Sequence, residues 1–107
     1  MSSLVRLCAV DEVSEGEPRR VVVDGYPPLA VYQVGDDYFV TADTCTHGMA
    51  SLCEGYQDGE EIECPYHGGA FNIKSGEPLA FPCTEPLETV PVELADNALW
   101  VESRASA

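Results

Sequence analysis

Two short segments of this sequence carry side chains that bind metals. The chain has two histidines, His47 and His67, and each lies within three residues of a cysteine, Cys45 or Cys64. Thiolate sulfur and imidazole nitrogen are the ligands of a mixed-ligand two-iron, two-sulfide cluster, in which two cysteines bind one iron and two histidines bind the other. These four residues therefore predict a centre that carries single electrons.

The spacing of the four residues suits one centre held between two loops. Cys45 and His47 are two positions apart, Cys64 and His67 are three apart, and sixteen residues separate the pairs. Each loop offers one sulfur and one nitrogen, so we expect Cys45 and Cys64 on a buried iron and the histidines on an outer one. Glycine after each histidine lets backbone N–H groups approach a sulfide closely.

The charge balance limits the partners of this chain. The sequence has 19 acidic residues against five basic ones, a formal net charge of −14. Nucleic acids and anionic membranes need Lys and Arg contacts, so both are expected to be absent as partners. A partner with a basic docking face would fit the charge, although an acidic composition without a docking role is the alternative.

The ends of the chain and its cysteines indicate the compartment. Asp11 and Glu12 come too early for a signal peptide. No apolar run approaches the ~18 residues of a membrane span. Five cysteines, an odd number, do not make a secreted disulfide framework. We expect a cytoplasmic protein, and a monomer.

Short β-branched and apolar runs predict a mostly β fold. Strands are expected at 4–10, 19–23, 29–34, 38–41, 89–94 and 98–102, with Asp11 capping a helical turn over 11–16. The turn residues 35–37 and 95–97 join two strand pairs into hairpins. Pro91 predicts an edge or an irregularity, because proline cannot donate a ladder hydrogen bond. Tyr32 and Trp100 are expected in the core.

Between about residues 43 and 86 the composition shifts to Gly, Pro, Cys and turn residues. Short strands are expected at 61–64 and 70–73. The stretch has little apolar surface of its own, and a metal cluster would supply a cross-link. We therefore predict one all-β domain over 1–107, with an antiparallel framework from 1–42 and 87–107 and a cluster-binding insert over about 43–86.

The two loops resemble the signature of Rieske [2Fe–2S] proteins, Cys-x-His followed after sixteen residues by Cys-x-x-His. The match extends over 45–48 and 64–71. This resemblance implies the Rieske iron–sulfur fold, an antiparallel β-sandwich framework with an inserted subdomain. It also implies one [2Fe–2S] cluster per chain, and Cys45, His47, Cys64 and His67 as its ligands. In family members a proline-containing loop covers the cluster, which implies that role for Pro82 or a neighbour.

Departures from the respiratory members of that family narrow the subtype. Those relatives join their loops by a disulfide at positions that here are Ala50 and Tyr66. They also place a serine, whose hydroxyl bonds a cluster sulfide, where this chain has Gly69. Loss of that donor implies a reduction potential near the lower end of the roughly −150 to +300 mV range of such centres.

This pattern resembles the ferredoxin component of bacterial multicomponent aromatic-ring oxygenases. The resemblance implies a soluble one-electron carrier, not an enzyme, between an NAD(P)H-dependent flavin reductase and a terminal oxygenase. The sequence has no spare histidine for a mononuclear iron site and no nucleotide-binding glycine motif. The substrate pocket and the flavin site are therefore expected in the partner proteins.

Several other residues have two interpretations. Docking of a partner is expected at the tip of the insert, where the apolar candidates are Met49, Leu52, Pro65, Tyr66, Phe81 and Pro82. For Met49 and Leu52 the alternative is that they pack inside the loop. The acidic run at 58–63 is a solvated face or a reductase-binding surface. Cys8, Cys53 and Cys83 are interpreted as small buried apolar side chains, although a disulfide between the last two is conceivable.

Two alternative protein classes share these features. Two cysteines and two histidines also make a structural zinc site. Zinc sites usually take two like ligands from each knuckle, and the nucleic-acid-binding ones are basic, which weighs against zinc. A small reductase subunit, such as that of nitrite reductase, is the second alternative; some of these lack the ligands that this chain keeps.

Overall fold

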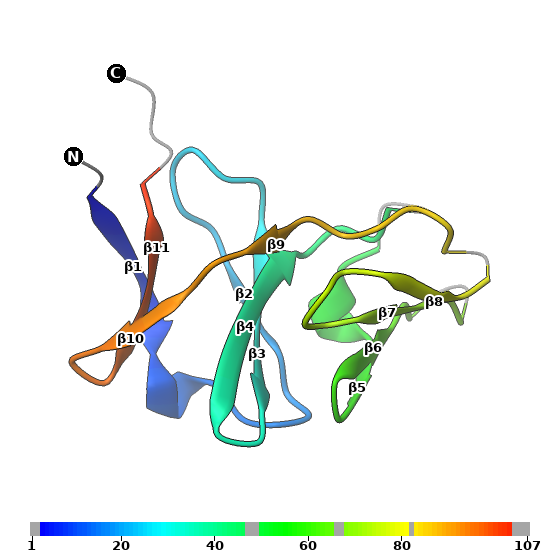
Figure 1. Cartoon of the computed structure of the whole chain (residues 1–107), viewed down its shortest axis with the longest axis horizontal. Helices are drawn as coiled ribbons and strands as arrows, with labels where there is room; N and C mark the ends of the chain where they lie inside the picture. Colours follow the sequence, from blue (N-terminus) through cyan, green and yellow to red (C-terminus); the bar gives the residue numbers. More distant parts are fainter. Residues whose placement is uncertain (1–2, 47–49, 66–67, 82, 104–107) are drawn as a thin grey trace.

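The computed structural model describes residues 3–46, 50–65, 68–81 and 83–103. Within these ranges the chain forms short strands and two single turns of 3-10 helix, which confirms the predicted all-β class (Figure 1). The strands are β1 (Leu4–Ala9), β2 (Arg19–Val21), β3 (Leu29–Val34), β4 (Asp37–Ala42), β5 (Tyr56–Asp58), β6 (Glu61–Glu63), β7 (Ala70–Asn72), β8 (Pro78–Ala80), β9 (Thr89–Val90), β10 (Glu93–Ala95) and β11 (Ala98–Glu102). The helical turns are η1 (Val10–Glu12) and η2 (Leu52–Glu54).

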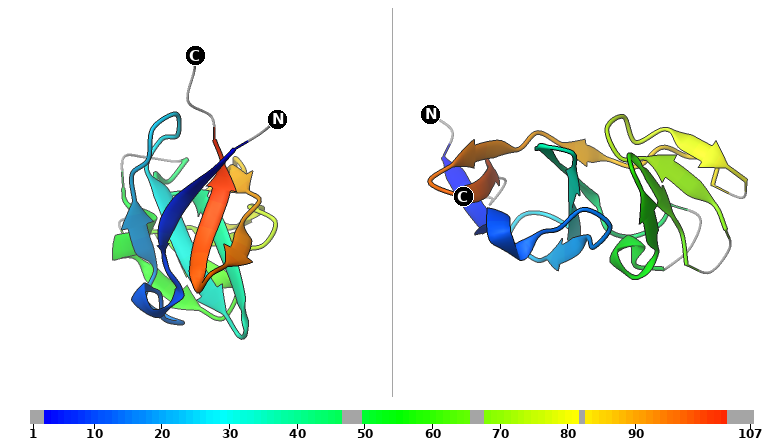
Figure 2. Two further views of the ribbon diagram at one scale, coloured as in Figure 1. Left: turned by 90° about the vertical axis from the view of Figure 1, so that its left-hand side faces the viewer. Right: turned by 90° about the horizontal axis from the view of Figure 1, so that it is seen from below.

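The described strands form three antiparallel sheets. Their strand orders are β1-β11-β10, β2-β3-β4-β9 and β5-β6-β7-β8. In Figure 1 the sheets follow one another along the 40 Å dimension of the molecule, with β1 and β11 at one end and β5–β8 at the other. Figure 2 shows the first and last strands, β1 and β11, side by side. The two ends of the chain thus build one part of the structure together.

Strand β3 is buried on both faces, and its side chains alternate between two cores. Leu29 and Val31 belong to a core shared with β1, β4 and β11. Ala30 and Tyr32 belong to a second core, whose other members come mostly from residues 45–87. All four are fully buried, and a buried side chain of the size of Leu29 or Val31 contributes ~1.5–3 kcal/mol. The central sheet therefore supports a layer on each face.

Two tight turns set the register of the hairpins, as the sequence predicts. Gly35 has φ +61° in the two-residue turn between β3 and β4. Asp96 and Asn97, with φ 53° and 58°, join β10 to β11. Positive φ at both central residues of the β10–β11 turn, and at the first central residue of the β3–β4 turn, marks turn types whose twist matches that of the flanking strands.

The predicted strand over 89–94 is wrong as one element. Its first part is β9, which pairs with β4, and its last part is β10, which pairs with β11. Pro91 lies between the two parts and lacks the N–H that a continuous ladder would need. The chain passes from one sheet to the next at this point.

Two smaller predictions at the ends of the chain also need correction. The first helical turn begins at Val10 with Ala9 as its N-cap, so Asp11 is not the cap. Glu12 supplies the capping interaction, because its carboxylate accepts a 2.7 Å hydrogen bond from the Ala9 N–H. Trp100 is only partly buried, and its indole N–H donates to the carbonyl of Ala95 at 3.0 Å.

Candidate metal centre

The first predicted loop is closed at its base by backbone pairing. Thr44 and Ser51 form an isolated antiparallel bridge. One residue further in, the Cys45 N–H donates to the carbonyl of Ala50 at 2.9 Å. The Cys45 side chain is 2% exposed and belongs to the same core as Tyr32. The loop thus starts with a thiol that points into the protein.

The second loop repeats this arrangement at the end of the β6–β7 hairpin. The Cys64 N–H donates to the carbonyl of Gly69 at 2.7 Å, which again links a cysteine to the residue five positions later. The Cys64 side chain is 1% exposed and lies in the core that holds Cys45. The predicted ligands His47 and His67 fall inside these two loops and outside the described residues.

A third segment, residues 83–86, lies against the first loop. The thiol sulfurs of Cys83 and Cys45 are 3.7 Å apart. Thr46 donates its hydroxyl to the carbonyl of Glu85 at 2.8 Å. A turn places the segment, because the Cys83 N–H donates to the carbonyl of Ala80 at 3.1 Å. This segment borders the stretch expected to cover a cluster; Pro82 itself lies outside the described residues.

Cys83 is a buried thiol within a group of three sulfur-bearing side chains. It is 4% exposed. Burial raises the pKa of the Cys83 thiol to about 12, and the neighbouring sulfurs of Cys45 and Cys64 add to that rise. All five cysteines lie in the described ranges and none is in a disulfide, so the conceivable bond between Cys53 and Cys83 is absent.

Gly69 leaves space that the sulfur of Cys83 fills. A Cβ atom built at position 69 would lie 2.3 Å from the Cys83 sulfur, much closer than van der Waals contact. Gly69 is buried, whereas a Cβ at the preceding Gly68 would meet nothing within 4 Å. The second loop therefore approaches the 83–86 segment by backbone alone.

Asp43 fixes the first loop, and the sequence interpretation missed it. Its carboxylate is buried, with 3% side-chain exposure, and it accepts hydrogen bonds from the Ser51 hydroxyl at 2.6 Å and the Cys53 N–H at 3.0 Å. The half-exposed Arg20 lies 3.3 Å from the same carboxylate. The sequence did not predict this role for Asp43, because the side chains that contact it lie 8 to 23 positions away along the chain.

The described residues fit a cluster with sulfur ligands on one iron. Two buried thiols from two equivalent loops share one core, and soft thiolates are the ligands that iron–sulfur clusters require. The 83–86 segment and the glycine backbone at position 69 enclose this side of the site. The donor set thus matches the cysteine half of the predicted centre.

Comparison with known proteins decides the family. The model of the Rieske [2Fe–2S] domain matches residues 3–91. Ferredoxin CarAc of Metapseudomonas resinovorans is 50% identical over 91% of this chain and 91% of its own length. The chain belongs to the Rieske [2Fe–2S] family.

Two solved structures share this fold. The ferredoxin of Sphingomonas yanoikuyae B1 is 48% identical, with a TM-score of 0.92 over 94% of this chain and 99% of its own. A structure described as a complex of reduced oxygenase and oxidized ferredoxin in carbazole 1,9a-dioxygenase is 47% identical, with a TM-score of 0.87 over 97% and 96%.

Membership of this family settles the class of cofactor and activity. This Rieske protein carries one [2Fe–2S] cluster per chain, so the zinc alternative is wrong. Its relatives are named as ferredoxins, which transfer electrons and leave the oxygenation to another component. No helix in the described ranges is long and apolar enough to cross a bilayer.

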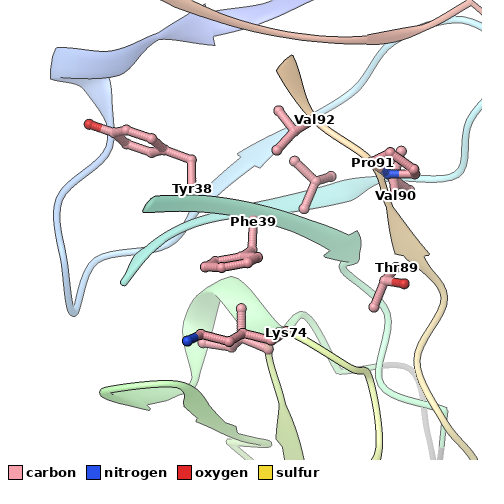
Figure 3. A pocket seen from close by; sticks show the side chains of 9 residues that line it. Tyr38, Phe39, Lys74, Thr89, Val90, Pro91 and Val92 are labelled. Carbon is pink, nitrogen blue, oxygen red and sulfur yellow. The ribbon is translucent and has the colours of Figure 1, made fainter. Parts of the chain in front are cut away.

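The Rieske protein also has a shallow groove away from the cysteine loops (Figure 3). Phe39 of β4, Lys74 after β7 and Thr89 of β9 line it, with Val92 at its edge. The Lys74 ammonium lies 5.7 Å from the centre of the Phe39 ring, which is within cation–π range. The groove follows the seam between two sheets, and these contacts favour a packing role.

The predicted docking residues divide by exposure. Leu52 is fully buried, so the packed-loop alternative is confirmed for it and the docking role is wrong. Phe81 is 85% exposed, and Pro65 is partly buried. Met49, Tyr66 and Pro82 lie outside the described residues. The acidic run is exposed, which fits both a solvated face and a reductase-binding surface; its members are Asp58, Glu60, Glu61 and Glu63.

Proposed function

We propose that this Rieske protein delivers single electrons from an NAD(P)H-dependent flavin reductase to a terminal aromatic-ring oxygenase in the cytoplasm. Two relatives support this function. The ferredoxin component of the p-cumate 2,3-dioxygenase system of Pseudomonas putida is 44% identical over 95% of this chain. A 47% identical ferredoxin has been solved in complex with its oxygenase. We further propose that the carrier acts as a monomer.

We propose Cys45, His47, Cys64 and His67 as the cluster ligands. The observation that carries this assignment is the matched geometry of the two cysteines. Each is almost fully buried, and each donates its N–H to a carbonyl five residues later at the base of a loop that contains one histidine. Such equivalence is expected when two loops hold one centre from opposite sides.

The cluster supplies the reversible uptake of one electron, and the protein side chains control its surroundings. Cys45 and Cys64 place their sulfurs in a dry core, which keeps water from these ligands. Asp43 holds the base of the first loop, and the bond from Thr46 to Glu85 ties that loop to the 83–86 segment. A rigid shell limits the reorganisation that each electron transfer requires.

We propose that residues 43–86 form the cluster-binding insert and that residues 1–42 and 87–107 form the framework. Sheet membership supports this division, because β5–β8 pair only with one another among the described strands. The two parts are not independent, since Ala30 and Tyr32 of β3 complete the core of the insert. Gln57 of β5 adds a polar link, donating its side-chain N–H to the Gln33 carbonyl at 2.8 Å.

Ligand substitutions test the assignment. Cys45→Ala, Cys64→Ala, His47→Ala and His67→Ala are expected to lose the visible spectrum of the oxidised cluster, because each removes a metal bond. Iron and acid-labile sulfide per chain give the quantitative measure. Cys8→Ala is the matched control, since Cys8 is 2% exposed but lies in the other core. A His67→Ala protein with an unchanged spectrum and normal electron delivery would refute the assignment.

Docking is proposed on the insert, at the outer face of β5–β6 together with Phe81. The outward side chains of this hairpin are Tyr56, Asp58, Glu61 and Glu63, all exposed. The insert range 43–86 has eight acidic residues against one basic residue, Lys74. An exposed apolar side chain on the same acidic insert suits a weak encounter of less than ~1,200 Å² with a basic partner.

Matched substitutions at the two ends of the molecule test this surface. Glu61→Lys and Phe81→Ser are expected to slow electron delivery several-fold, measured by stopped-flow reduction of the carbazole dioxygenase oxygenase used as a probe. Glu93→Lys and Leu94→Ser are the controls, because both residues are exposed on β10 in a different sheet. Equal slowing by the two sets would contradict docking on the insert.

A further inference from the structure

Cys83 is not a predicted ligand, yet it contacts one. Its sulfur lies 3.7 Å from the sulfur of Cys45, a distance at which one thiol can donate a weak hydrogen bond to the other. Both side chains are almost fully buried, at 4% and 2% exposure, so water does not compete for this contact. The pair sits between the first loop and the 83–86 segment.

The direction of this hydrogen bond follows from charge. If Cys45 binds iron, it is a thiolate and can only accept. A second thiolate 3.7 Å away in the same buried site would repel it strongly. Cys83 therefore keeps its proton and is the donor.

The position of Cys83 is enforced from the other side by the second loop. Gly69 provides the space, since a Cβ there would lie 2.3 Å from the Cys83 sulfur and 3.1 Å from its Cβ. The Cys83 N–H is bonded to the Ala80 carbonyl, and Glu85 is tied to Thr46 two residues further on. The backbone is thus fixed on both sides of the thiol, which leaves its sulfur directed at Cys45.

We propose that Cys83 is a positioning residue that donates its S–H hydrogen bond to the ligand sulfur of Cys45 and thereby raises the reduction potential of the cluster. A donor to a ligand sulfur draws electron density from it and favours the more negative, reduced state. This inference rests on the proposed ligand role of Cys45. It gives Cys83 a function beyond filling space, which the sequence interpretation did not assign.

Cys83→Ala and Cys83→Ser separate donation from packing. Alanine removes the donor, so the ratio of reduced to oxidised protein at a fixed solution potential is expected to fall about two- to fivefold. A tenfold change in that ratio corresponds to about 59 mV for one electron. Serine keeps a donor of similar size, so its ratio is expected to equal or exceed that of the natural protein. Cys8→Ala, an equally buried thiol in the other core, is expected to leave the ratio unchanged.

Resonance Raman spectra in H₂O and D₂O give a second measure that packing does not affect. The Fe–S(Cys) stretching bands of the natural protein are expected to shift on deuteration, and Cys83→Ala is expected to reduce that shift. An unchanged ratio with an unchanged deuterium shift would overturn the proposal. So would equal falls for alanine and serine, since that result would indicate packing alone.

Two further outcomes are distinguishable. If Cys83→Ala does not assemble a cluster, Cys83→Ser decides: a ratio at or above that of the natural protein supports donation, and a lower ratio overturns it. If Cys45→Ala keeps the cluster with an unchanged spectrum, the ligand assignment itself fails. Loss of the cluster in Cys45→Ala, together with an unaltered potential and an unaltered deuterium shift in Cys83→Ala, would overturn the hydrogen bond while leaving the ligand assignment intact.

Discussion

At the scale of single residues, one buried carboxylate sets the shape of the first cysteine loop. The Asp43 carboxylate accepts hydrogen bonds from the Ser51 hydroxyl and the Cys53 N–H on the far side of that loop. Its backbone N–H donates to the carbonyl of Pro28, and its carbonyl accepts from the N–H of Leu52. A buried charge is stable only when its hydrogen-bonding capacity is filled, and here the loop itself fills it. The residue therefore links loop closure to the framework.

Removal of this carboxylate is expected to loosen the loop. Asp43→Ala leaves the Ser51 hydroxyl and the Cys53 N–H without their acceptor, and should lower the free energy of unfolding by ~2–4 kcal/mol. Arg20→Ala should cost less than ~1 kcal/mol, because Arg20 is half exposed. Urea unfolding and the rate of cluster loss are the measurements, with Asp36→Ala in the exposed turn as the control. An Asp43→Ala protein as stable as this control would contradict the role.

Gly69 and Cys83 are a coupled pair, and their coupling can be measured. Gly69→Ala should destabilise the loop strongly, because its Cβ would lie 2.3 Å from the Cys83 sulfur. Cys83→Ala in the same chain should restore much of that loss, since it removes the blocking atom. Gly68→Ala is the comparison: its space is open, and the cost should stay near ~1 kcal/mol from its φ of +72°. Additive effects of Gly69→Ala and Cys83→Ala in a double-mutant cycle would be inconsistent with this contact.

At the scale of elements, the turns between strands determine which sheet each strand joins. The β10–β11 turn has Asp96 and Asn97 at positive φ, and the Asn97 carbonyl accepts the N–H of Val10. Pro91 ends pairing with β4, after which the chain enters the sheet with β11. The turn and the proline thus place β10 and β11 in the same sheet as the first strand, β1.

The β10–β11 turn offers a direct stability test. Glycine adopts positive φ without the steric cost that asparagine has, so Asn97→Gly should raise the free energy of unfolding by ~0.5 kcal/mol. Asn97→Val should lower it by more than ~1 kcal/mol, because a β-branched residue fits this conformation poorly. Thermal unfolding of both variants is the measurement. A Val variant as stable as the Gly variant would show that φ at this turn does not limit the hairpin.

At the scale of the whole molecule, charge is uneven along the chain. Four of the five basic residues lie within 1–20 or at position 104, and the range between them has one, Lys74. That lysine is engaged with Glu60 at 3.6 Å and with the Phe39 ring. The β5–β8 end therefore presents uncompensated negative charge to an approaching partner.

Electron delivery is expected to depend on salt. A net charge of −14 attracts a basic docking face from a distance, and counter-ions screen that attraction beyond about 8 Å at physiological ionic strength. The second-order rate of oxygenase reduction should fall about three- to tenfold between low salt and ~0.3 M. Stopped-flow rates across a salt series give the slope. A rate that stays flat or rises with salt would argue for an apolar or like-charged encounter.

Stability at alkaline pH follows from the buried groups of the core. Burial raises the pKa of Tyr32, which is fully enclosed and hydrogen-bonded to Thr41 at 2.9 Å. A raised folded pKa leaves stability complete below the unfolded value of ~10 and lost as pH rises further, because the unfolded chain ionises first. The thermal midpoint should therefore decline above about pH 10, and less steeply in Tyr32→Phe. Identical slopes in the two proteins would exclude Tyr32 as the cause.

The sequence by itself determined what depends on local chemistry. Cys45 and Cys64 with their nearby histidines indicate a metal centre with sulfur and nitrogen ligands, because ligand preference is a property of the side chains and their spacing. Turn residues such as Asn97 marked the hairpins for a similar reason, because their φ preference acts within two or three residues. Tyr32 was placed correctly in the core from the run of apolar residues around it.

Only the tertiary structure decided which distant residues meet. The contacts of Asp43 with Arg20 and of Cys83 with Cys45 span 23 and 38 positions, and no local pattern encodes them. The break at Pro91 was visible, but the change of sheet was not, because strand pairing depends on packing across the whole molecule. Ligand chemistry is therefore readable along the chain, whereas the surroundings that tune those ligands arise from close packing between segments far apart in sequence.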